Sequence, residues 1–170
     1  PLVQLNGAIP RVLGQGPGDW TERQRLLFRT AAARGEDKVV LIGSDSPHLT
    51  VDLIADAFAL LDTHDVVLGP VYDGGYYLIG MRGWHDVLSG VRMSTTSVFE
   101  EVVAAARTVG VSVGFVPSTF DVDELEDLRH LDSIAVSRTD LPTTIAALAE
   151  LGLLTSGGPP GVESDHPRPW

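Results

Sequence analysis

The sequence predicts an α/β fold in which helices cover a mostly parallel β-sheet. Along the chain, short apolar runs alternate with longer segments whose apolar residues recur at helical spacing, which is the pattern of successive strand and helix units. Residues 38–44 hold an uninterrupted apolar stretch bounded by Asp37 and Gly43, as expected of a strand buried on both faces of a parallel sheet. These two observations define the expected fold class.

The first two helices are predicted from apolar stripes and from residues that start or stop helices. Residues 20–34 contain helix-forming residues with apolar side chains on one face, and Gly35 is a typical terminator. After the 38–44 strand, Thr50 can cap a second helix that runs to Leu61, because Asp52 places negative charge in its first turn. A strand, a short loop and a helix are therefore expected here.

Two further strands and a helix follow. Residues 65–70 and 76–80 are apolar enough for strands, and a glycine-rich connection separates them. A helix is expected over 94–108, capped by Ser94 or Thr95. The alternation of strands and helices thus continues.

The last part of the sequence predicts a final strand over 111–117, a short helix with an acidic start over 123–131, and an amphipathic helix over 141–153. The Leu and Ala stripe of the last helix is interpreted as either core or the face of a homo-oligomer. We expect a single domain over 1–153, followed by a polar, Gly- and Pro-rich tail over 154–170 that is disordered.

Composition excludes several classes of function. The 170-residue chain has a formal net charge of -11, and its twelve Lys and Arg residues are not clustered, which argues against nucleic acid as a partner. No apolar run approaches the roughly 20 residues of a membrane span. The absence of cysteine excludes disulfides, thiolate catalysis and cysteine-ligated zinc. With no signal-peptide pattern at the start, a cytoplasmic location is expected.

Carboxylates follow two of the predicted strands, where ligands collect in parallel α/β sheets. Asp45 comes directly after the 38–44 strand and can hold Mg²⁺ or Mn²⁺ bridging a diphosphate, although it could equally cap the turn that follows. Asp121 and Asp123 follow the last strand, and in extended backbone both lie on one side. One of them could complete the coordination begun by Asp45.

A second motif, Asp73-Gly-Gly-Tyr76, joins the strands at 65–70 and 76–80. Adjacent glycines allow a ligand to approach the backbone closely, and Asp73 could hold a sugar hydroxyl. Because Asp-Gly between two apolar strands is also the commonest hairpin signal, a plain hairpin turn is the favoured alternative.

Several motifs occur in the same order along this sequence as in one bacterial protein family, which the sequence resembles. The resemblance covers roughly residues 20–131, and the segments that carry it are Val39–Leu49, Asp65–Pro70, Asp73–Gly80, Ser94-Thr95, Asp121–Asp123 and Glu126–Leu128. Together they resemble the bacterial GT-A-like glycosyltransferases of the arsenosugar-biosynthesis type, in the nucleotide-diphospho-sugar transferase superfamily.

This resemblance implies a GT-A-like three-layer sandwich, distant kinship with molybdenum-cofactor and phospholactate nucleotidyltransferases, and an active site at the carboxyl edge of the sheet. It implies Asp45 and Asp73 as catalytic residues and Asp45, Asp121 and Asp123 as ligands of Mg²⁺ or Mn²⁺. The residues that it assigns to substrate binding are Ser44, Gly74, Gly75, Tyr76, Ser94 and Thr95.

The sequence also departs from the family pattern. Nothing in residues 1–19 matches the family's first strand and its Lys- and Arg-containing nucleotide loop, so we expect that loop to be missing. The family's Trp before the Ser-Thr pair is Met93, and its Thr-Pro between the acidic residues is Glu124-Leu125. A differently shaped pocket is therefore expected.

Three functions remain open from the sequence. The first is metal-dependent transfer of a sugar from a nucleotide sugar to a small-molecule acceptor. The second is nucleotidyl transfer, which releases pyrophosphate instead of a nucleoside diphosphate. The third is a non-catalytic binding or assembly protein that keeps the sheet without the nucleotide loop.

Overall fold

The computed structural model describes residues 14–154, and within them the chain divides into two compact units. Unit 1 consists of residues up to 43 together with 50–120, and unit 2 consists of 44–49 together with the residues from 121 onward. Residues 1–13, and the predicted tail beyond residue 154, lie outside the described residues.

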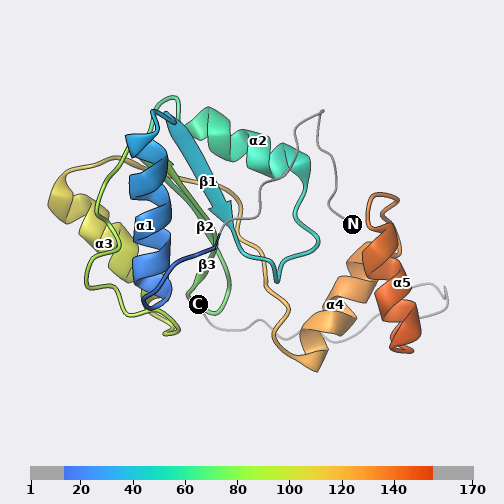
Figure 1. The fold of residues 1–170 in the computed structure, drawn as a ribbon. Helices are drawn as coiled ribbons and strands as arrows, with labels where there is room; N and C mark the ends of the chain where they lie inside the picture. The colour runs from blue at the N-terminus through green and yellow to red at the C-terminus, as the bar shows by residue number, and fades with distance from the viewer. Residues whose placement is uncertain (1–13, 155–170) are drawn as a thin grey trace. The chain divides into compact units, whose positions relative to one another are not determined.

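Unit 1 contains most of the regular structure (Figure 1). Its elements in chain order are α1 (Trp20–Ala33), β1 (Lys38–Ile42), α2 (Val51–Leu60), β2 (Val66–Pro70), β3 (Tyr76–Arg82), α3 (Val98–Val109) and β4 (Val113–Phe115). Unit 2 contains α4 (Leu125–Ala135) and α5 (Pro142–Glu150). Each of these elements corresponds to one that the sequence predicts.

The sheet of unit 1 is mixed, which corrects the prediction of a mostly parallel sheet. The described strands follow the order β1-β3-β2-β4, in which β3 is antiparallel to both β1 and β2, and only β2 and β4 are parallel. The connection between β2 and β3 spans residues 71–75. A parallel crossover needs a dozen or more residues, so this short turn forces the two strands to run in opposite directions.

The strand β1 also differs from expectation. The sequence predicts burial on both faces, whereas the residues of β1 are only half-buried and Ile42 is 41% exposed. Among the described strands, β1 lies at one end of the order and pairs only with β3. The apolar residues Val39 and Leu41 of β1 pack against the edge of the core cluster. Their apolar character therefore does not place β1 at the centre of a parallel sheet.

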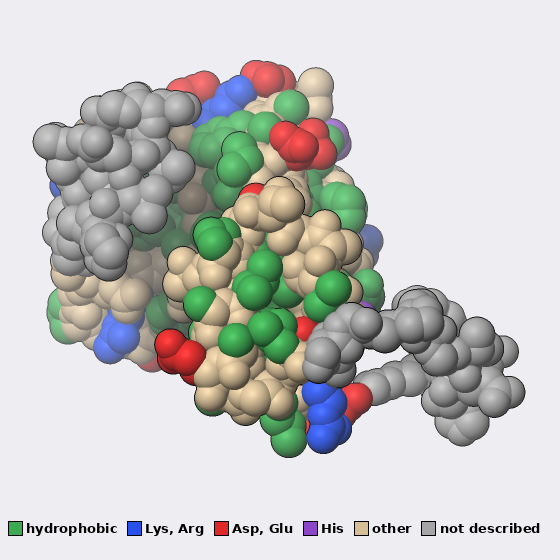
Figure 2. Space-filling model, turned by 90° about the vertical axis from the view of Figure 1, so that its right-hand side faces the viewer, with side chains coloured by type: hydrophobic (Ala, Val, Ile, Leu, Met, Phe, Trp, Pro, Cys, Tyr) green, Lys and Arg blue, Asp and Glu red, His purple; other side chains and the backbone are tan. Residues whose placement is uncertain are grey.

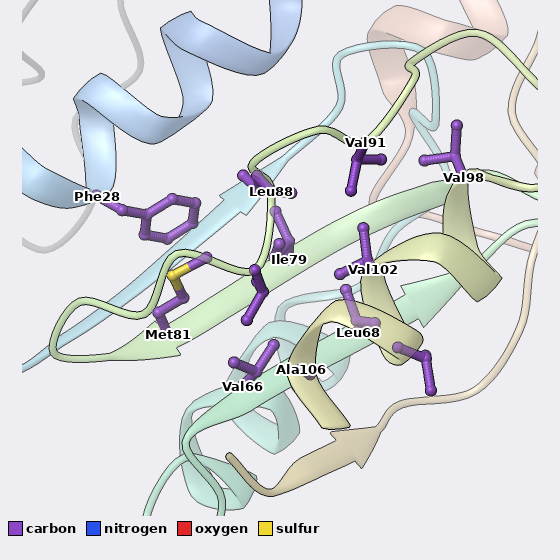
Figure 3. Packing of buried hydrophobic residues seen from close by; sticks show 12 residues of the cluster. Phe28, Val66, Leu68, Ile79, Met81, Leu88, Val91, Val98, Val102 and Ala106 are labelled. Atoms are coloured by element: carbon purple, nitrogen blue, oxygen red, sulfur yellow. The ribbon is translucent and has the colours of Figure 1, made fainter. Parts of the chain in front are cut away.

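Helices cover both faces of the sheet in unit 1. Phe28 of α1 and Val102 of α3 lie in one buried cluster with Ile79 of β3 (Figure 3). The next residue of β3, Gly80, faces the other side, where an added Cβ would lie 3.2 Å from Leu61 at the end of α2. Because neighbouring strand residues alternate between faces, unit 1 is a three-layer α/β/α arrangement.

Local capping explains where α2 begins, and backbone conformation explains why α3 begins later than predicted. Thr50 accepts a hydrogen bond from the Leu53 N–H at 3.1 Å and so caps α2, as predicted. By contrast, α3 begins at Val98 rather than near Ser94. Ser94 has φ 61°, in the left-handed region, which is incompatible with an α-helix. The residues expected to cap α3 therefore form a loop before it.

Unit 2 has a small core of its own, in which Leu131 and Ala135 of α4 and Leu148 of α5 are buried. Pro142 occupies the first turn of α5, where its missing N–H costs no helical hydrogen bond. Among the described residues, none of the helices has the length and hydropathy that a membrane crossing requires.

Candidate functional site

Unit 2 brings together the three carboxylates that the sequence predicts as metal ligands. Asp45, Asp121 and Asp123 each offer one oxygen atom, and these atoms all lie within 4.8 Å of one another. Asp45 and Asp123 are exposed, and Asp121 is half-buried. Residues more than 70 positions apart in the sequence thus form one acidic cluster at the surface of unit 2.

Backbone hydrogen bonds hold this cluster in place. The Val122 N–H donates to the carbonyl oxygen of Asp45 at 2.9 Å, so the residue between Asp121 and Asp123 is joined directly to Asp45. The Asp127 carboxylate in the first turn of α4 accepts from the backbone N–H of Asp123 at 3.1 Å. The two segments that carry the carboxylates are therefore held together by main-chain contacts.

Arg138, which follows α4, fixes the other end of the 44–49 segment. Its Nη1 donates to the carbonyl oxygen of His48, and its Nε donates to Asp140 Oδ1 at 2.9 Å. The His48 side chain is buried, and this burial is the main reason why the pKa of its imidazole is lowered. The nearby charges of Arg138 and His130 lower this pKa further. A lowered pKa favours the neutral form of His48 beside the Arg138 guanidinium.

The donor set suits a hard divalent cation. Carboxylate oxygens are the ligands that Mg²⁺ and Ca²⁺ prefer, and Mn²⁺ accepts them equally. Two ligands of the same ion are at most about twice the metal–oxygen distance apart, which is about 4.2 Å for Mg²⁺ and about 4.8 Å for Ca²⁺. The oxygens of Asp45, Asp121 and Asp123 lie in or close to this range, so small side-chain shifts would suffice.

In unit 1, the Asp73-Gly-Gly motif forms the turn of the β2–β3 hairpin. The Gly75 N–H donates to Asp73 Oδ1 at 2.9 Å, and the Val71 N–H donates to the Gly75 carbonyl oxygen at 3.2 Å. The hairpin alternative considered for this motif is thus the backbone conformation that it adopts. The Asp73 side chain is nevertheless exposed, with one oxygen engaged in the turn.

The same turn packs tightly against the loop before α3. Gly74 has φ 94°, and a Cβ at this position would lie 1.9 Å from the carbonyl oxygen of Thr96. The Phe99 N–H also donates to the Gly74 carbonyl oxygen at 3.0 Å. Only glycine fits between the hairpin and this loop. The structure therefore brings Gly74 and Gly75 beside the loop that contains Ser94 and Thr95.

Tyr76 is placed differently from the other residues predicted to bind substrate. Its hydroxyl donates to Gln24 Oε1 of α1 at 2.8 Å and also contacts Met93 Sδ at 3.8 Å. Burial raises the pKa of this phenol to about 12. The polar end of Tyr76 thus points into the interior of unit 1.

Sequence reasoning did not find Arg138 or the contribution of α5 to the cluster's surroundings. Arg138 and Asp140 lie two residues apart in a turn, a spacing that is common at exposed turns and carries no specific signal. A hollow beside Asp45 is lined in part by Thr144 and Ala147 of α5, which the sequence marks only as one side of an amphipathic helix.

Residues 4–95 match the model of the family described as "Uncharacterized protein conserved in bacteria (DUF2064)". The chain belongs to the DUF2064 family. The matched region of this DUF2064 chain includes Asp45, the hairpin turn and Ser94-Thr95, and it ends before Asp121.

This DUF2064 chain is also similar to a solved structure, described as a "putative nucleotide-diphospho-sugar transferase from Desulfovibrio desulfuricans G20". The two share 33% sequence identity with a TM-score of 0.76, over 82% of this chain and 62% of the other. The chain thus spans less than two thirds of the length of that relative. No curated protein matches the sequence.

Proposed function

We propose that this DUF2064 chain is a metal-dependent glycosyltransferase that moves a sugar from a nucleotide sugar to a small-molecule acceptor. The cluster of Asp45, Asp121 and Asp123 carries the proposal. The 33% identity to the structure described as a "putative nucleotide-diphospho-sugar transferase" supports it.

In this proposal, Asp45, Asp121 and Asp123 hold Mg²⁺ or Mn²⁺. When bound, the cation neutralises charge on the leaving diphosphate. The protein contributes mainly by positioning the two substrates and by keeping the carboxylates preorganised through the Val122–Asp45 backbone hydrogen bond.

The remaining predicted residues have narrower roles in the proposal. In unit 1, Asp73 offers a substrate hydroxyl the carboxylate oxygen that the Gly75 N–H leaves available. Ser94, which is exposed, and Thr95, whose hydroxyl donates to the Arg92 carbonyl oxygen at 3.1 Å, contact the substrate from the loop beside Gly74. Ser44, which precedes Asp45, contacts the diphosphate.

The decisive variant is Asp45→Asn, which keeps the size of the side chain and removes its charge. We expect Mn²⁺ affinity to fall by about tenfold or more, and turnover to fall by about 100-fold or more, because one anionic ligand is lost. Bound Mn²⁺ is measured by electron paramagnetic resonance, and turnover by release of nucleoside diphosphate from a panel of nucleotide sugars.

The matched control is Asp56→Asn, which removes an exposed carboxylate of α2 that lies outside the cluster. This variant should bind Mn²⁺ and turn over like the parent chain. Undiminished turnover in Asp45→Asn would disprove the role of the cluster, and release of pyrophosphate would show nucleotidyl transfer in place of glycosyl transfer.

A further inference from the structure

Unit 2 contains a hollow directly beside the carboxylate cluster. Its volume is about 350 Å³, within the range of small-molecule sites. The residues that line it are Ser44, Asp45, Pro47, Val122, Leu128 and Leu131, with Thr143, Thr144, Ala147, Leu148 and Leu151 from α5 and its end.

The lining is mostly apolar. Leu128 and Leu131 of α4 and Leu148 of α5 all line the hollow, and Asp45 is the one charged residue among those that line it. Polar groups come from the hydroxyls of the two threonines at the start of α5 and from the Ser44–Asp45 end. Figure 2 shows hydrophobic side chains gathered among a surface of backbone and uncharged side chains.

The hollow and the carboxylate cluster share residues. Asp45 belongs to both, and Val122 lies between the two other carboxylates of the cluster. A molecule in the hollow therefore has one end beside Asp45 and its body against the leucines of α4 and α5. This arrangement orients a ligand that is polar at one end and apolar at the other.

We infer that the hollow binds the acceptor, and that the acceptor is an alcohol with an apolar body, such as an aryl or medium-length alkyl group. A second sugar is disfavoured, because its several hydroxyls would lie against apolar walls without hydrogen-bond partners. This inference rests on the proposed glycosyltransferase function and assigns the chemical class of its acceptor.

The group transfer balances without a further reactant. The bond between the sugar's anomeric carbon and the diphosphate oxygen breaks, and its electron pair leaves with the nucleoside diphosphate. The acceptor oxygen forms the new bond to the anomeric carbon, and the acceptor's hydroxyl proton passes to water. The apolar body of the acceptor lies against the leucines of the hollow. These apolar walls select the acceptor without taking part in the reaction.

The test fills the hollow with Ala147→Trp, because Ala147 is exposed on α5 and a larger side chain there extends into the hollow rather than into the core. The matched control is Ala149→Trp, an exposed position of α5 outside the lining. The probe is 2-phenylethanol, with glycerol as the polar comparison. Binding is measured by amide chemical shifts, and transfer by the glycoside product.

In the parent chain, 2-phenylethanol should shift amides in α4 and α5 without metal or nucleotide, and it should be a better acceptor than glycerol. Ala147→Trp should weaken this binding by about tenfold or more and remove the preference over glycerol. Ala149→Trp should match the parent chain in binding, in transfer, in hydrolysis of the nucleotide sugar by water and in Mn²⁺ binding.

The outcomes separate the two proposals. If the parent chain hydrolyses a nucleotide sugar but Ala147→Trp keeps both the shifts and the preference, the acceptor assignment is wrong while the glycosyltransferase function stands. If 2-phenylethanol shifts α4 and α5 but no nucleotide sugar is turned over, the function fails, and the acceptor role fails with it.

Discussion

At the scale of single residues, the acidic side chains of this DUF2064 chain differ in what they contact. Asp127 accepts hydrogen bonds from the N–H groups of Asp123 and Glu124 and so stabilises the start of α4. Asp45 and Asp123 instead present exposed carboxylates to each other across a short distance. Like charges held together raise the electrostatic free energy of the folded chain, and a bound cation would remove this cost.

Tyr76 provides a prediction at this scale. Replacing it by Phe removes the donor to Gln24, which is only 3% exposed, so an acceptor inside unit 1 loses its partner. We expect Tyr76→Phe to lower the free energy of unfolding by about 1–3 kcal/mol at pH 8. Urea unfolding measures this change.

The effect of Tyr76→Phe should depend on pH. The folded-state pKa of about 12 lies above the ordinary value of 10.0, so the unfolded chain loses the phenolic proton first as pH rises. The stabilisation from the protonated phenol is therefore complete below pH 10 and is lost between pH 10 and 12. The gap between the parent chain and Tyr76→Phe should shrink above pH 10, and a constant gap would contradict the shifted pKa.

At the scale of elements, the cluster depends on how the 44–49 segment is attached to the residues around α4. One attachment is the Val122–Asp45 backbone hydrogen bond. A second is Arg138, whose guanidinium donates hydrogen bonds both to the His48 carbonyl oxygen and to the Asp140 carboxylate. The Arg138 side chain is 18% exposed. A planar guanidinium can serve both partners at once, which a lysine ammonium does less well.

Arg138→Lys should therefore loosen the segment while keeping the charge. If the proposed metal site exists, Mn²⁺ affinity should fall by roughly threefold to tenfold, since groups that orient ligands typically matter at about this level or more. Isothermal titration with Mn²⁺ gives the affinity. Arg129→Lys is the control, because Arg129 pairs with Glu126 on the exposed side of α4, and equal losses in both variants would refute a positioning role for Arg138.

At the scale of the whole molecule, the candidate residues belong to two units. The carboxylate cluster and the apolar hollow lie in unit 2, whereas the hairpin turn and the Ser94-Thr95 loop lie in unit 1. Unit 2 is itself discontinuous, because 44–49 comes from the middle of the unit 1 sequence. Asp45 thus belongs to unit 2 because it lies in the short segment that connects β1 to α2.

This division predicts where a cation acts. With Mg²⁺, amide hydrogen exchange should slow in residues 44–49 and in the 121–123 segment, and it should change little in β2 and β3. A bound ligand protects only the openings that disrupt its own site, which explains the expected difference. Mass spectrometry of peptides is sufficient to measure this exchange. Amide exchange that Mg²⁺ leaves unchanged in both units would contradict Mg²⁺ binding by the cluster.

The sequence alone determined the local features of this protein. It predicted each helix and strand that the structure describes in 14–154, because caps such as Thr50, terminators such as Gly35 and apolar periodicity act over a few neighbouring residues. It also predicted Asp45, Asp121 and Asp123 as candidate metal ligands, because these residues follow strands.

The Asp-Gly signal already favoured a hairpin between β2 and β3, but only the tertiary structure decided how the other strands pair and which distant side chains meet. In the structure, β3 lies between β1 and β2 and is antiparallel to both, although the uninterrupted apolar run at 38–44 had indicated a parallel sheet. The Tyr76 hydroxyl bonds to Gln24, 52 residues away, and Asp45 meets Asp121 through contacts between distant segments. Such pairings depend on how the chain folds back on itself, so the sequence could name the residues of the candidate site but not assemble them.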